Sequence, residues 1–480
     1  MTTVTDRRLE RGDAVRPAAS IVHLGPGAFF RAFNAVYTAD AMEAEGGDWG
    51  IVAVSLKSPT ARDQLKPQDG VYTSVSLTPE GAEYRVIPSI VDVLVAPEDP
   101  EAVLEAMTAP ATKIVSLTVT EKGYCHEPST GRLNLKHPDI AHDLGGGAPR
   151  SAPGFLVEAL ARRRAAGLAP FTVLSCDNLP SNGHLAKAIV LEFARNRDAD
   201  LADWIEANVP FPATMVDRIT PATTESDVED LAAAQGYADP GCVLHEPFRQ
   251  WVIEDDFVAG RPAWEAGGAQ FVSAVEAHEN MKLRCLNGTH STLAYLGYLA
   301  GYETVAETVA DPAFAKLCQK LWREEIVPTL EKPEGEDLEA YCAALLERYR
   351  NPAIRHRTWQ IAMDGSQKLP QRILGTVADN LAAENQPSGL ILAVAAWMRY
   401  VGGVDEKGAV IDVRDPLADR LKAASDGAAD DAATVDALLA EREVFSPELA
   451  GDARFRDALV KAYSDLKARG SAAVVAEFVA

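Results

Sequence analysis

The sequence predicts an α/β domain with a doubly wound parallel sheet, followed by an all-helical domain. The apolar run at 20–25 predicts a buried strand that leads into a glycine-containing turn and a helix. A second apolar strand, at 50–56, follows about 25 residues later, which is the spacing of a β-α-β unit. Beyond residue 275 strand candidates are nearly absent. Because 480 residues are too many for one core, we expect one domain over 1–275 and a helical domain over 276–480.

Strand and helix patterns alternate along the first domain, as in a doubly wound sheet. Further strands are expected at Tyr72–Leu77, Tyr84–Val95, Lys113–Thr120 and Phe171–Ser175. Helices are expected near 98–108, 153–166 and 184–196. In the second domain, amphipathic helical patterns cover 281–300, 311–327, 337–350, 353–363, 387–401, 416–425 and 432–443.

Charge and composition exclude several classes of protein. A net charge of −24 and a pI near 4.8 argue against a nucleic-acid partner and an anionic membrane surface. The chain has no apolar run of about 18 residues and no apolar signal core at its start, so we expect a cytoplasmic protein. Six scattered cysteines without a C-x-x-C pair indicate reduced, structural thiols and no zinc site. A small molecule remains as the expected partner.

A glycine pair stands where a dinucleotide-binding loop is expected, between the first strand and its helix. Small residues at Gly25 and Gly27 let the backbone approach a pyrophosphate at the helix N-terminus. Phe30 occupies the place of the usual third glycine, so a plain tight turn is the alternative. No acidic residue for a ribose follows the second strand until Asp63, and Lys57 would tolerate a 2′-phosphate. The choice between NAD and NADP therefore stays open.

Three polar residues, Lys282, Asn287 and His290, predict a general-base site. At about 100° per residue they share one arc of roughly 140° on a helix. Burial favours the neutral amine of a lysine, and a neutral amine beside two hydrogen-bonding groups suits a general base. Three polar residues that merely face inward are the alternative. Leu283, Leu286 and Leu293 are expected on the same arc, and Arg284, Gly288 and Ser291 on the opposite side.

Two further segments of the first domain add polar candidates. Asn178 follows a strand at its carboxyl end, where open α/β sheets bind ligands, although an Asx turn explains it equally well. Asp217 precedes Arg218, and the two are explained equally by an ion pair within a loop. Tyr463-x-x-x-Lys467 matches the catalytic pair of short-chain dehydrogenases, but it lies far from any sheet strand, so we treat it as chance.

Five motifs stand in order along the chain: Gly25-x-Gly27-x-Phe29-x-Arg31-Ala32, Thr118-Val-Thr-Glu121-Lys-Gly-Tyr124, Ser175-Cys-Asp-Asn-Leu179, Val216-Asp-Arg-Ile219 and Lys282-x4-Asn287-Gly-x-His290. In this order and spacing they resemble the mannitol dehydrogenase family, the polyol-specific long-chain dehydrogenases. The likeness covers nearly the whole chain. Within the family, the fructuronate reductases are most similar at Glu246–Asp255, Arg355–Pro370 and Trp397–Tyr400.

The resemblance implies a Rossmann-type domain, a helical domain like the C-terminal domain of 6-phosphogluconate dehydrogenase, and no metal. It implies NAD as cofactor, with NADP not excluded, bound at Gly25, Gly27, Phe29, Arg31, Thr120 and Glu121. Lys282 would be the general acid/base and His290 would orient the substrate. Asn178 and Asn287 would hold the reacting oxygen, and Glu279 would relay protons.

Two departures from the family pattern concern cofactor and substrate. Phe30 and Phe33 replace histidines that are usual after the glycine loop, which should alter the cofactor-side wall of the site. Gln360 stands where many mannitol dehydrogenases carry an arginine. We infer that another basic residue binds a sugar-acid carboxylate, which bidentate arginine recognition would suit. With Asp217, the substrate-binding candidates are His356, Arg357, Lys368 and Arg372, and solvated helix charges are the alternative.

The leading hypothesis from sequence is a reversible, NAD-dependent reduction of D-fructuronate to D-mannonate. The nearest rival is the epimeric pair tagaturonate and altronate, followed by neutral polyols such as mannitol or arabinitol. A catalytically silent sugar-acid sensor is a rival of another class, although the Lys282, Asn287 and His290 set argues against it. Family members include monomers, and a monomer is compatible with this sequence.

Overall fold

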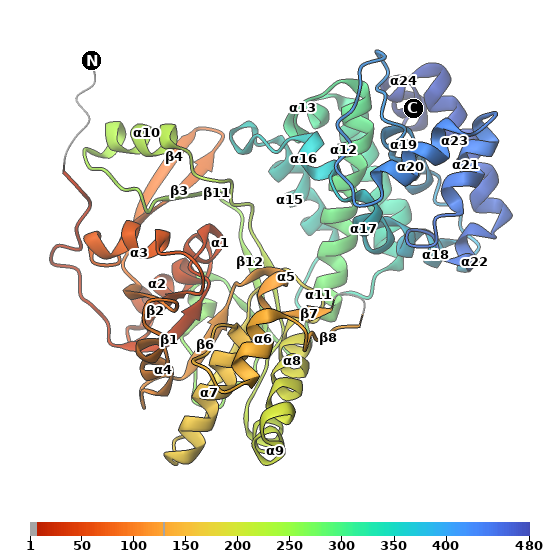
Figure 1. Ribbon diagram of the computed structural model, residues 1–480. Coiled ribbons are helices and arrows are strands. Elements are labelled where there is room, and N and C mark those ends of the chain that lie inside the picture. The colour runs from red at the N-terminus through yellow and green to blue at the C-terminus, as the bar shows by residue number, and fades with distance from the viewer. Residues whose placement is uncertain (1–6, 128–129) are drawn as a thin grey trace. The chain divides into compact units, whose positions relative to one another are not determined.

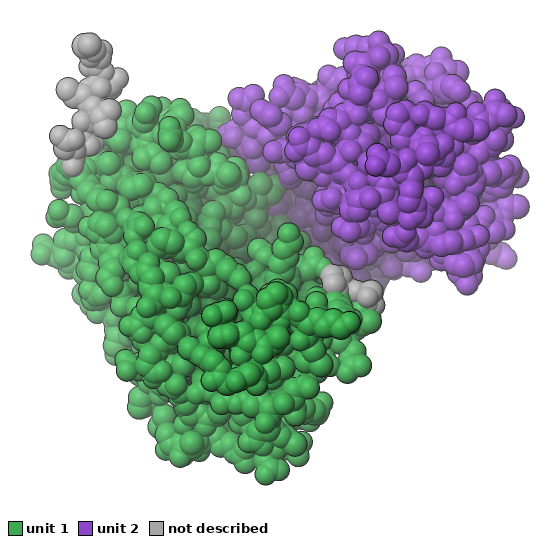
Figure 2. All heavy atoms as spheres, in the orientation of Figure 1, with its two compact units in different colours: residues 1–276 green, residues 277–480 purple. Residues whose placement is uncertain are grey.

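The computed structural model describes residues 7–127 and 130–480. The chain divides into two compact units, Met1–Glu276 and Ala277–Ala480, the N-terminal and the C-terminal unit (Figure 2). None of the helices in these described residues has the length and apolar character needed to cross a lipid bilayer.

A five-stranded parallel sheet forms the centre of the N-terminal unit, in the order β5-β2-β1-β6-β9 (Figure 1). Alternate residues of a strand face opposite sides, so Ile21 and Val22 enter two different apolar clusters. The strand order reverses beside β1, which confirms the expected doubly wound fold. The strands are β1 (Ala19–Leu24), β2 (Gly50–Ser55), β5 (Ile90–Val95), β6 (Ile114–Leu117) and β9 (Thr172–Ser175).

Helices cover both faces of this sheet. The cluster around Val22 includes residues of α4 (Pro100–Thr108), α7 (Ala152–Ala165), α8 (Asn182–Arg197) and α9 (Ala199–Asn208). The cluster around Ile21 includes α1 (Ala28–Ala32) and α2 (Asn34–Glu45), packed with Trp251 and Trp264. The remaining elements are α3 (Thr60–Leu65), η1 (Lys66–Gln68), α5 (Thr120–Gly123), β7 (His126–Glu127), β8 (Arg132–Leu133), α6 (Pro138–Leu144), α10 (Glu225–Gln235) and η2 (Trp264–Gly267).

The single strand predicted over Tyr84–Val95 is wrong, because the chain forms two strands there. β4 (Gly81–Ile87) pairs antiparallel with β3 (Tyr72–Thr78), whereas β5 joins the central sheet. Pro88 separates the two strands because it lacks the N–H that a sheet ladder needs. Two small sheets, β11-β3-β4 and β10-β12-β13, contain strands that lie outside the predicted ones. These are β10 (Thr214–Asp217), β11 (Val243–His245), β12 (Gln250–Glu254) and β13 (Gln270–Val272).

The C-terminal unit, which the structure describes in full, is helical and contains no strand element. α12 (Thr289–Ala300) packs against α19 (Ser388–Val401), and α19 packs against α23 (Ala453–Arg469), within one large apolar cluster (Figure 1). Each predicted segment contains helix, although 353–363 is helical mainly at α16 (Thr358–Ala362). The other helices are α11 (Glu276–Met281), η3 (Lys282–Gly288), α13 (Val305–Ala310), α14 (Pro312–Lys320), η4 (Leu321–Ile326), η5 (Val327–Thr329), α15 (Leu338–Arg350), η6 (Pro352–Ile354), α17 (Gly365–Leu369), η7 (Pro370–Leu374), α18 (Gly375–Ala382), α20 (Ala418–Asp426), α21 (Asp431–Leu439), α22 (Pro447–Ala450) and α24 (Ser471–Phe478).

Candidate active site

Gly25 makes the turn between β1 and α1, at the carboxyl edge of the central sheet. Its φ is +99°, and a Cβ at this position would overlap the Thr118 carbonyl oxygen, so the turn has no room for a side chain. At Gly27 a Cβ would meet nothing within 4 Å. The loop is therefore tightly held at Gly25 and open at Gly27, just before α1. The carboxyl ends of β1 and β6 are where a doubly wound sheet binds ligands.

The aromatic residues after the loop are part of the core. Phe30 is wholly buried and stacks on His23 with ring centroids 3.6 Å apart. Phe33 is also wholly buried and stacks on the half-buried Phe29 at 4.9 Å. Both phenylalanine rings are thus packed in the core, and the expectation that they alter the cofactor-side wall of the site stays a prediction.

Arg31, a candidate cofactor contact, joins α1 to the segment before β11. Its Nη1 donates to the Gly241 carbonyl at 2.6 Å, and Tyr72 Oη donates to the Arg31 carbonyl at 2.5 Å. Burial lowers the pKa of the guanidinium. Its proposed contact with a cofactor stays a prediction.

A buried histidine that sequence reasoning missed links β1 to β6. His23 contacts Ser116 Oγ at 2.8 Å through Nδ1 and Thr118 Oγ1 at 2.9 Å through Nε2. Thr118 Oγ1 also donates to the Gly25 carbonyl at 2.7 Å. Burial lowers the pKa of His23 to about 3, so the ring is neutral at physiological pH. The neutral ring holds the glycine turn against the end of β6.

Asp177, directly before the predicted Asn178, organises the ends of β6 and β9. Its carboxylate accepts from Val119 N at 3.1 Å, from Thr120 N at 2.8 Å and from Tyr124 Oη at 2.8 Å. Thr120 has a φ of +63°, an unfavourable value for a β-branched residue, which these bonds hold in place. The sequence motif contained Asp177, but only the fold shows that it points inward. Asn178 itself is exposed, as are Thr120 and Glu121.

Asp217, a substrate-binding candidate, is buried at the end of β10. The neighbouring Arg218 donates to the Ala32 carbonyl at 2.6 Å and to the Glu246 carbonyl at 3.0 Å. Burial lowers the pKa of Arg218 to about 10. Arg218 thus ties the end of β10 to the last residue of α1 and to the segment after β11.

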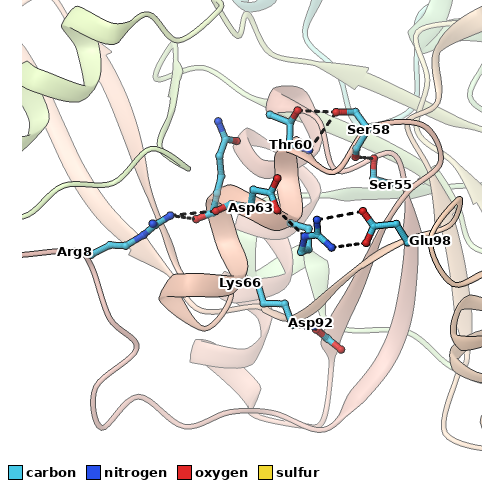
Figure 3. A network of polar contacts seen from close by, with 10 residues as sticks. Arg8, Ser55, Ser58, Thr60, Asp63, Lys66, Asp92 and Glu98 are labelled. Atoms are coloured by element: carbon cyan, nitrogen blue, oxygen red, sulfur yellow. Dashed lines mark hydrogen bonds and ion pairs between the residues drawn. The ribbon is translucent and has the colours of Figure 1, made fainter.

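Hydroxyl groups dominate the turn after β2, where a dinucleotide ribose would be recognised (Figure 3). Ser55 Oγ donates to the Ser58 carbonyl at 2.5 Å, and Ser58 Oγ lies 2.6 Å from Thr60 Oγ1. Asp63, the first acidic residue, is bound by Arg62, which also pairs with Glu98. Lys57, in the same turn, is paired as well, because its Nζ lies 2.9 Å from an Asp139 carboxylate oxygen.

Lys282 begins a π-helix, η3, in place of the α-helix that the predicted arc assumed. The prediction of which residues face inward and which face outward is wrong in part. A π-helix rotates through a smaller angle per residue than an α-helix, and α12 is buried on all sides. Ser291, expected on the outer side, is 1% exposed, and a Cβ on Gly288 would lie 2.8 Å from the Arg372 carbonyl oxygen. Lys282 is buried as expected, at 8% exposure, and Asn287 is half-buried.

His290 lies in an aromatic and cationic environment. Its ring centroid is 4.7 Å from Tyr349 and 5.0 Å from His356, which stands nearly perpendicular to it. Burial, followed by the electrostatic influence of His356, Arg348 and Arg372, holds the pKa of His290 well below its usual value. Burial likewise lowers the pKa of His356 to about 4. Both rings are therefore neutral hydrogen-bonding groups at physiological pH.

The candidate cations differ in burial. Lys368 and Arg372 are half-buried: Lys368 Nζ donates to the Met363 carbonyl at 2.6 Å, and Arg372 Nη1 donates to Ser291 Oγ at 3.2 Å. Burial is the main cause that lowers the pKa of each. Arg357 is different, because its side chain is 53% exposed and lies 3.7 Å from Glu303. Arg357 precedes α16 and is exposed, as is Gln360, so its role in substrate binding stays a prediction beside the alternative of a solvated charge.

The remaining candidates are Glu279, the Tyr463 motif, the cysteines and any metal-binding group. Glu279 is half-buried in α11. Lys467 pairs with Asp431 at 2.6 Å on the surface, which agrees with a chance match of the Tyr463 motif. All six cysteines are buried and free. Over residues 7–127 and 130–480, no group of three or more His, Cys, Asp or Glu side chains is arranged to hold a metal ion.

Comparisons with known proteins agree with this two-unit arrangement. The family description "Mannitol dehydrogenase Rossmann domain" matches residues 19–266, and "Mannitol dehydrogenase C-terminal domain" matches residues 274–467. The chain is 49% identical to the D-mannonate oxidoreductase of Escherichia coli K12, over 99% of this chain and 100% of the relative. It is 41% identical to a mannitol 2-dehydrogenase of Phaeosphaeria nodorum, over 95% and 81%.

Solved structures show the same fold. The Pseudomonas fluorescens mannitol 2-dehydrogenase in ternary complex with NAD and D-mannitol has a TM-score of 0.82 at 39% identity, covering 98% of this chain and 96% of that one. A substrate-free D-sorbitol dehydrogenase has a TM-score of 0.90 at 33% identity, covering 98% of both chains. The chain therefore belongs to the mannitol dehydrogenase family and is an oxidoreductase that acts on a CH–OH group.

Proposed function

We propose that this protein reversibly reduces D-fructuronate to D-mannonate with NADH. The overall identity to a D-mannonate oxidoreductase supports a sugar-acid substrate. The structural observation that carries the proposal is the pair of half-buried cations, Lys368 and Arg372, in the region of the substrate-orienting candidate His290. In a chain with a net charge of −24, such a pair gives an anionic substrate a local attractive site.

The N-terminal unit fits a dinucleotide. Gly25 has no space for a side chain and Gly27 opens to solvent before α1, so backbone groups there are accessible to a pyrophosphate. Bound NADH would supply the hydride, and NAD⁺ would accept it in the reverse direction. We favour NAD because the related Pseudomonas fluorescens mannitol 2-dehydrogenase was solved with NAD. NADP remains the alternative.

Lys282 is proposed as the general acid/base. In reduction, its ammonium gives a proton to the C5 oxygen while the hydride adds to C5, so the ketone becomes a secondary alcohol. In oxidation, the neutral amine removes that proton. Asn178 and Asn287 donate amide N–H groups to the developing oxyanion, a contribution worth several kcal/mol when preorganised. Neutral His290 orients a substrate hydroxyl, and Glu279 relays the proton to solvent.

Arg372 is the preferred carboxylate ligand of the proposed substrate. A guanidinium forms two parallel hydrogen bonds with a carboxylate, and partial burial strengthens both. Lys368 and neutral His356 lie in the same region and complete the polar lining. Arg357, exposed and beside Glu303, is less suited to this role.

A second candidate is oxidation of a neutral polyol, favoured by the likeness to the mannitol 2-dehydrogenase complex. Tagaturonate reduction is the third. Initial rates of NADH and NADPH oxidation with D-fructuronate, D-tagaturonate and D-fructose separate them. Preference for D-fructuronate by about 10²-fold in kcat/KM supports the proposal. Equal or faster turnover of fructose would assign the protein to polyols instead.

A further inference from the structure

Two aromatic side chains and a neighbouring threonine hold the π-helix that carries Lys282 and Asn287. Trp322 Nε1 donates to the Cys285 carbonyl at 2.9 Å, and Thr289 Oγ1 donates to the same oxygen at 2.5 Å. Tyr349 Oη donates a hydrogen bond to the Leu286 carbonyl oxygen at 3.0 Å. A π-helix replaces the ordinary i−4 ladder by a less common i−5 ladder, and these side-chain donors add further bonds to its carbonyl groups.

Tyr349, on α15, contacts both the π-helix and the start of α12. It is 3% exposed, and its hydroxyl also lies 2.7 Å from Thr289 Oγ1, one residue before His290. Its ring packs against the His290 imidazole. Burial holds the pKa of the phenol well above its usual value, so the hydroxyl keeps its proton and donates throughout the working pH range.

We propose that Tyr349 is a positioning residue for the reaction. Its hydroxyl fixes the backbone between Lys282 and Asn287, and its aromatic ring fixes the imidazole of His290. This inference rests on the proposed chemistry of Lys282, Asn287 and His290. The three groups must be held within fractions of an ångström to act on one bound substrate. A tyrosine that touches the π-helix and His290 together couples their positions.

The alternative role for Tyr349 is apolar filling of the core, which a phenylalanine would also perform. Tyr349→Phe keeps the ring and removes only the hydroxyl. Thr289→Val is a second variant that removes Oγ1 at nearly constant shape. Tyr400→Phe is the matched control, because Tyr400 is a buried tyrosine of the same unit whose hydroxyl has no hydrogen-bond partner among the described residues.

Steady-state kinetics and hydrogen–deuterium exchange of the full-length protein test the proposal together. For Tyr349→Phe we expect kcat to fall by about 10-fold with KM within about 2-fold, together with a shifted pH profile of kcat. Amide exchange should rise in peptides covering 282–290. Thr289→Val should show the same pattern, and Tyr400→Phe should show neither change.

Unchanged kcat in Tyr349→Phe, or a fall of equal size in Tyr400→Phe, would overturn the positioning role. Exchange does not depend on turnover. If the unmodified protein reduces none of the three ketoses, the proposed function fails, and unchanged exchange over 282–290 in Tyr349→Phe would then show separately that the phenol does not anchor the π-helix. Increased exchange in that case would show that Tyr349 anchors the π-helix even though the proposed function has failed.

Discussion

The two units hold their candidate residues by different means. In the N-terminal unit, backbone geometry at strand ends positions them: Gly25 turns with a positive φ, and the Asp177 carboxylate accepts from the backbone of the strained Thr120 loop. In the C-terminal unit, side chains hold a widened helix and surround His290 with rings and cations. We therefore expect changes at the glycine turn to act on folding and cofactor binding, and changes at the π-helix and around His290 to act on the chemistry.

The largest expected effect comes from removing the proposed acid/base. Lys282→Ala should lower kcat by well over about 10²-fold, since no other group is proposed to transfer this proton. NADH affinity, measured by fluorescence titration, should change by less than about 3-fold because the glycine loop lies in the other unit. Lys461→Ala is the control, as Lys461 is a surface lysine paired with Asp465. Near-normal turnover of Lys282→Ala would remove the mechanism.

Gly25 tests the comparison in the N-terminal unit, where backbone geometry is expected to matter most. Gly25→Ala places a Cβ against the Thr118 carbonyl at a positive φ and should cost about 2–4 kcal/mol of unfolding free energy. Gly27→Ala, with open space around its Cβ, should leave stability within about 1 kcal/mol but weaken NADH binding. Denaturant unfolding of both variants measures the unfolding free energy, and NADH titration measures the binding affinity. Equal stability of the two variants would contradict the distinction.

The predictability of each region follows the same division. The first strands and the Gly25 turn were readable because a buried parallel strand is a continuous run of apolar residues and glycine marks the turn. Lys282, Asn287 and His290 were proposed from residue type and order, but the π-helix that carries Lys282 and Asn287 has no simple periodic signature. Asp177, His23 and Tyr349 were missed because their roles depend on contacts between residues far apart in sequence.

Substrate choice sharpens the comparison within the C-terminal unit. Arg372→Met should lower kcat/KM for D-fructuronate by about 30-fold, because a carboxylate loses its bidentate partner, and should change D-fructose turnover by less than about 3-fold. Arg372→Lys should restore only part of the loss, since an ammonium lacks the planar fork. Arg357→Ala serves as the exposed comparison. A larger loss in Arg357→Ala than in Arg372→Met would move the carboxylate site to Arg357.

The smallest expected effect is on the pH dependence of stability. Each unit contains a buried carboxyl group with a raised pKa, Asp177 in the first and Glu325 in the second. Asp177 accepts from Val119 N and Thr120 N, and Glu325 on η4 accepts from Gly389 N and Leu390 N at the start of α19. Burial outweighs these bonds in both, so both pKa values are raised, that of Glu325 from 4.5 to about 7. Glu325 is 6% exposed and thus little screened.

The sign of the resulting pH dependence is fixed by linkage. A carboxyl whose folded pKa lies above its unfolded value contributes stability that is fully present below pH 4.5 and is lost as the pH rises through about 7. Between pH 6 and pH 8, Glu325 should therefore lower the unfolding free energy by about 1 kcal/mol. Glu325→Gln should remove that slope, because an amide does not titrate. Parallel urea unfolding of both proteins across this range measures it, and identical slopes would mean that Glu325 does not titrate between pH 6 and pH 8.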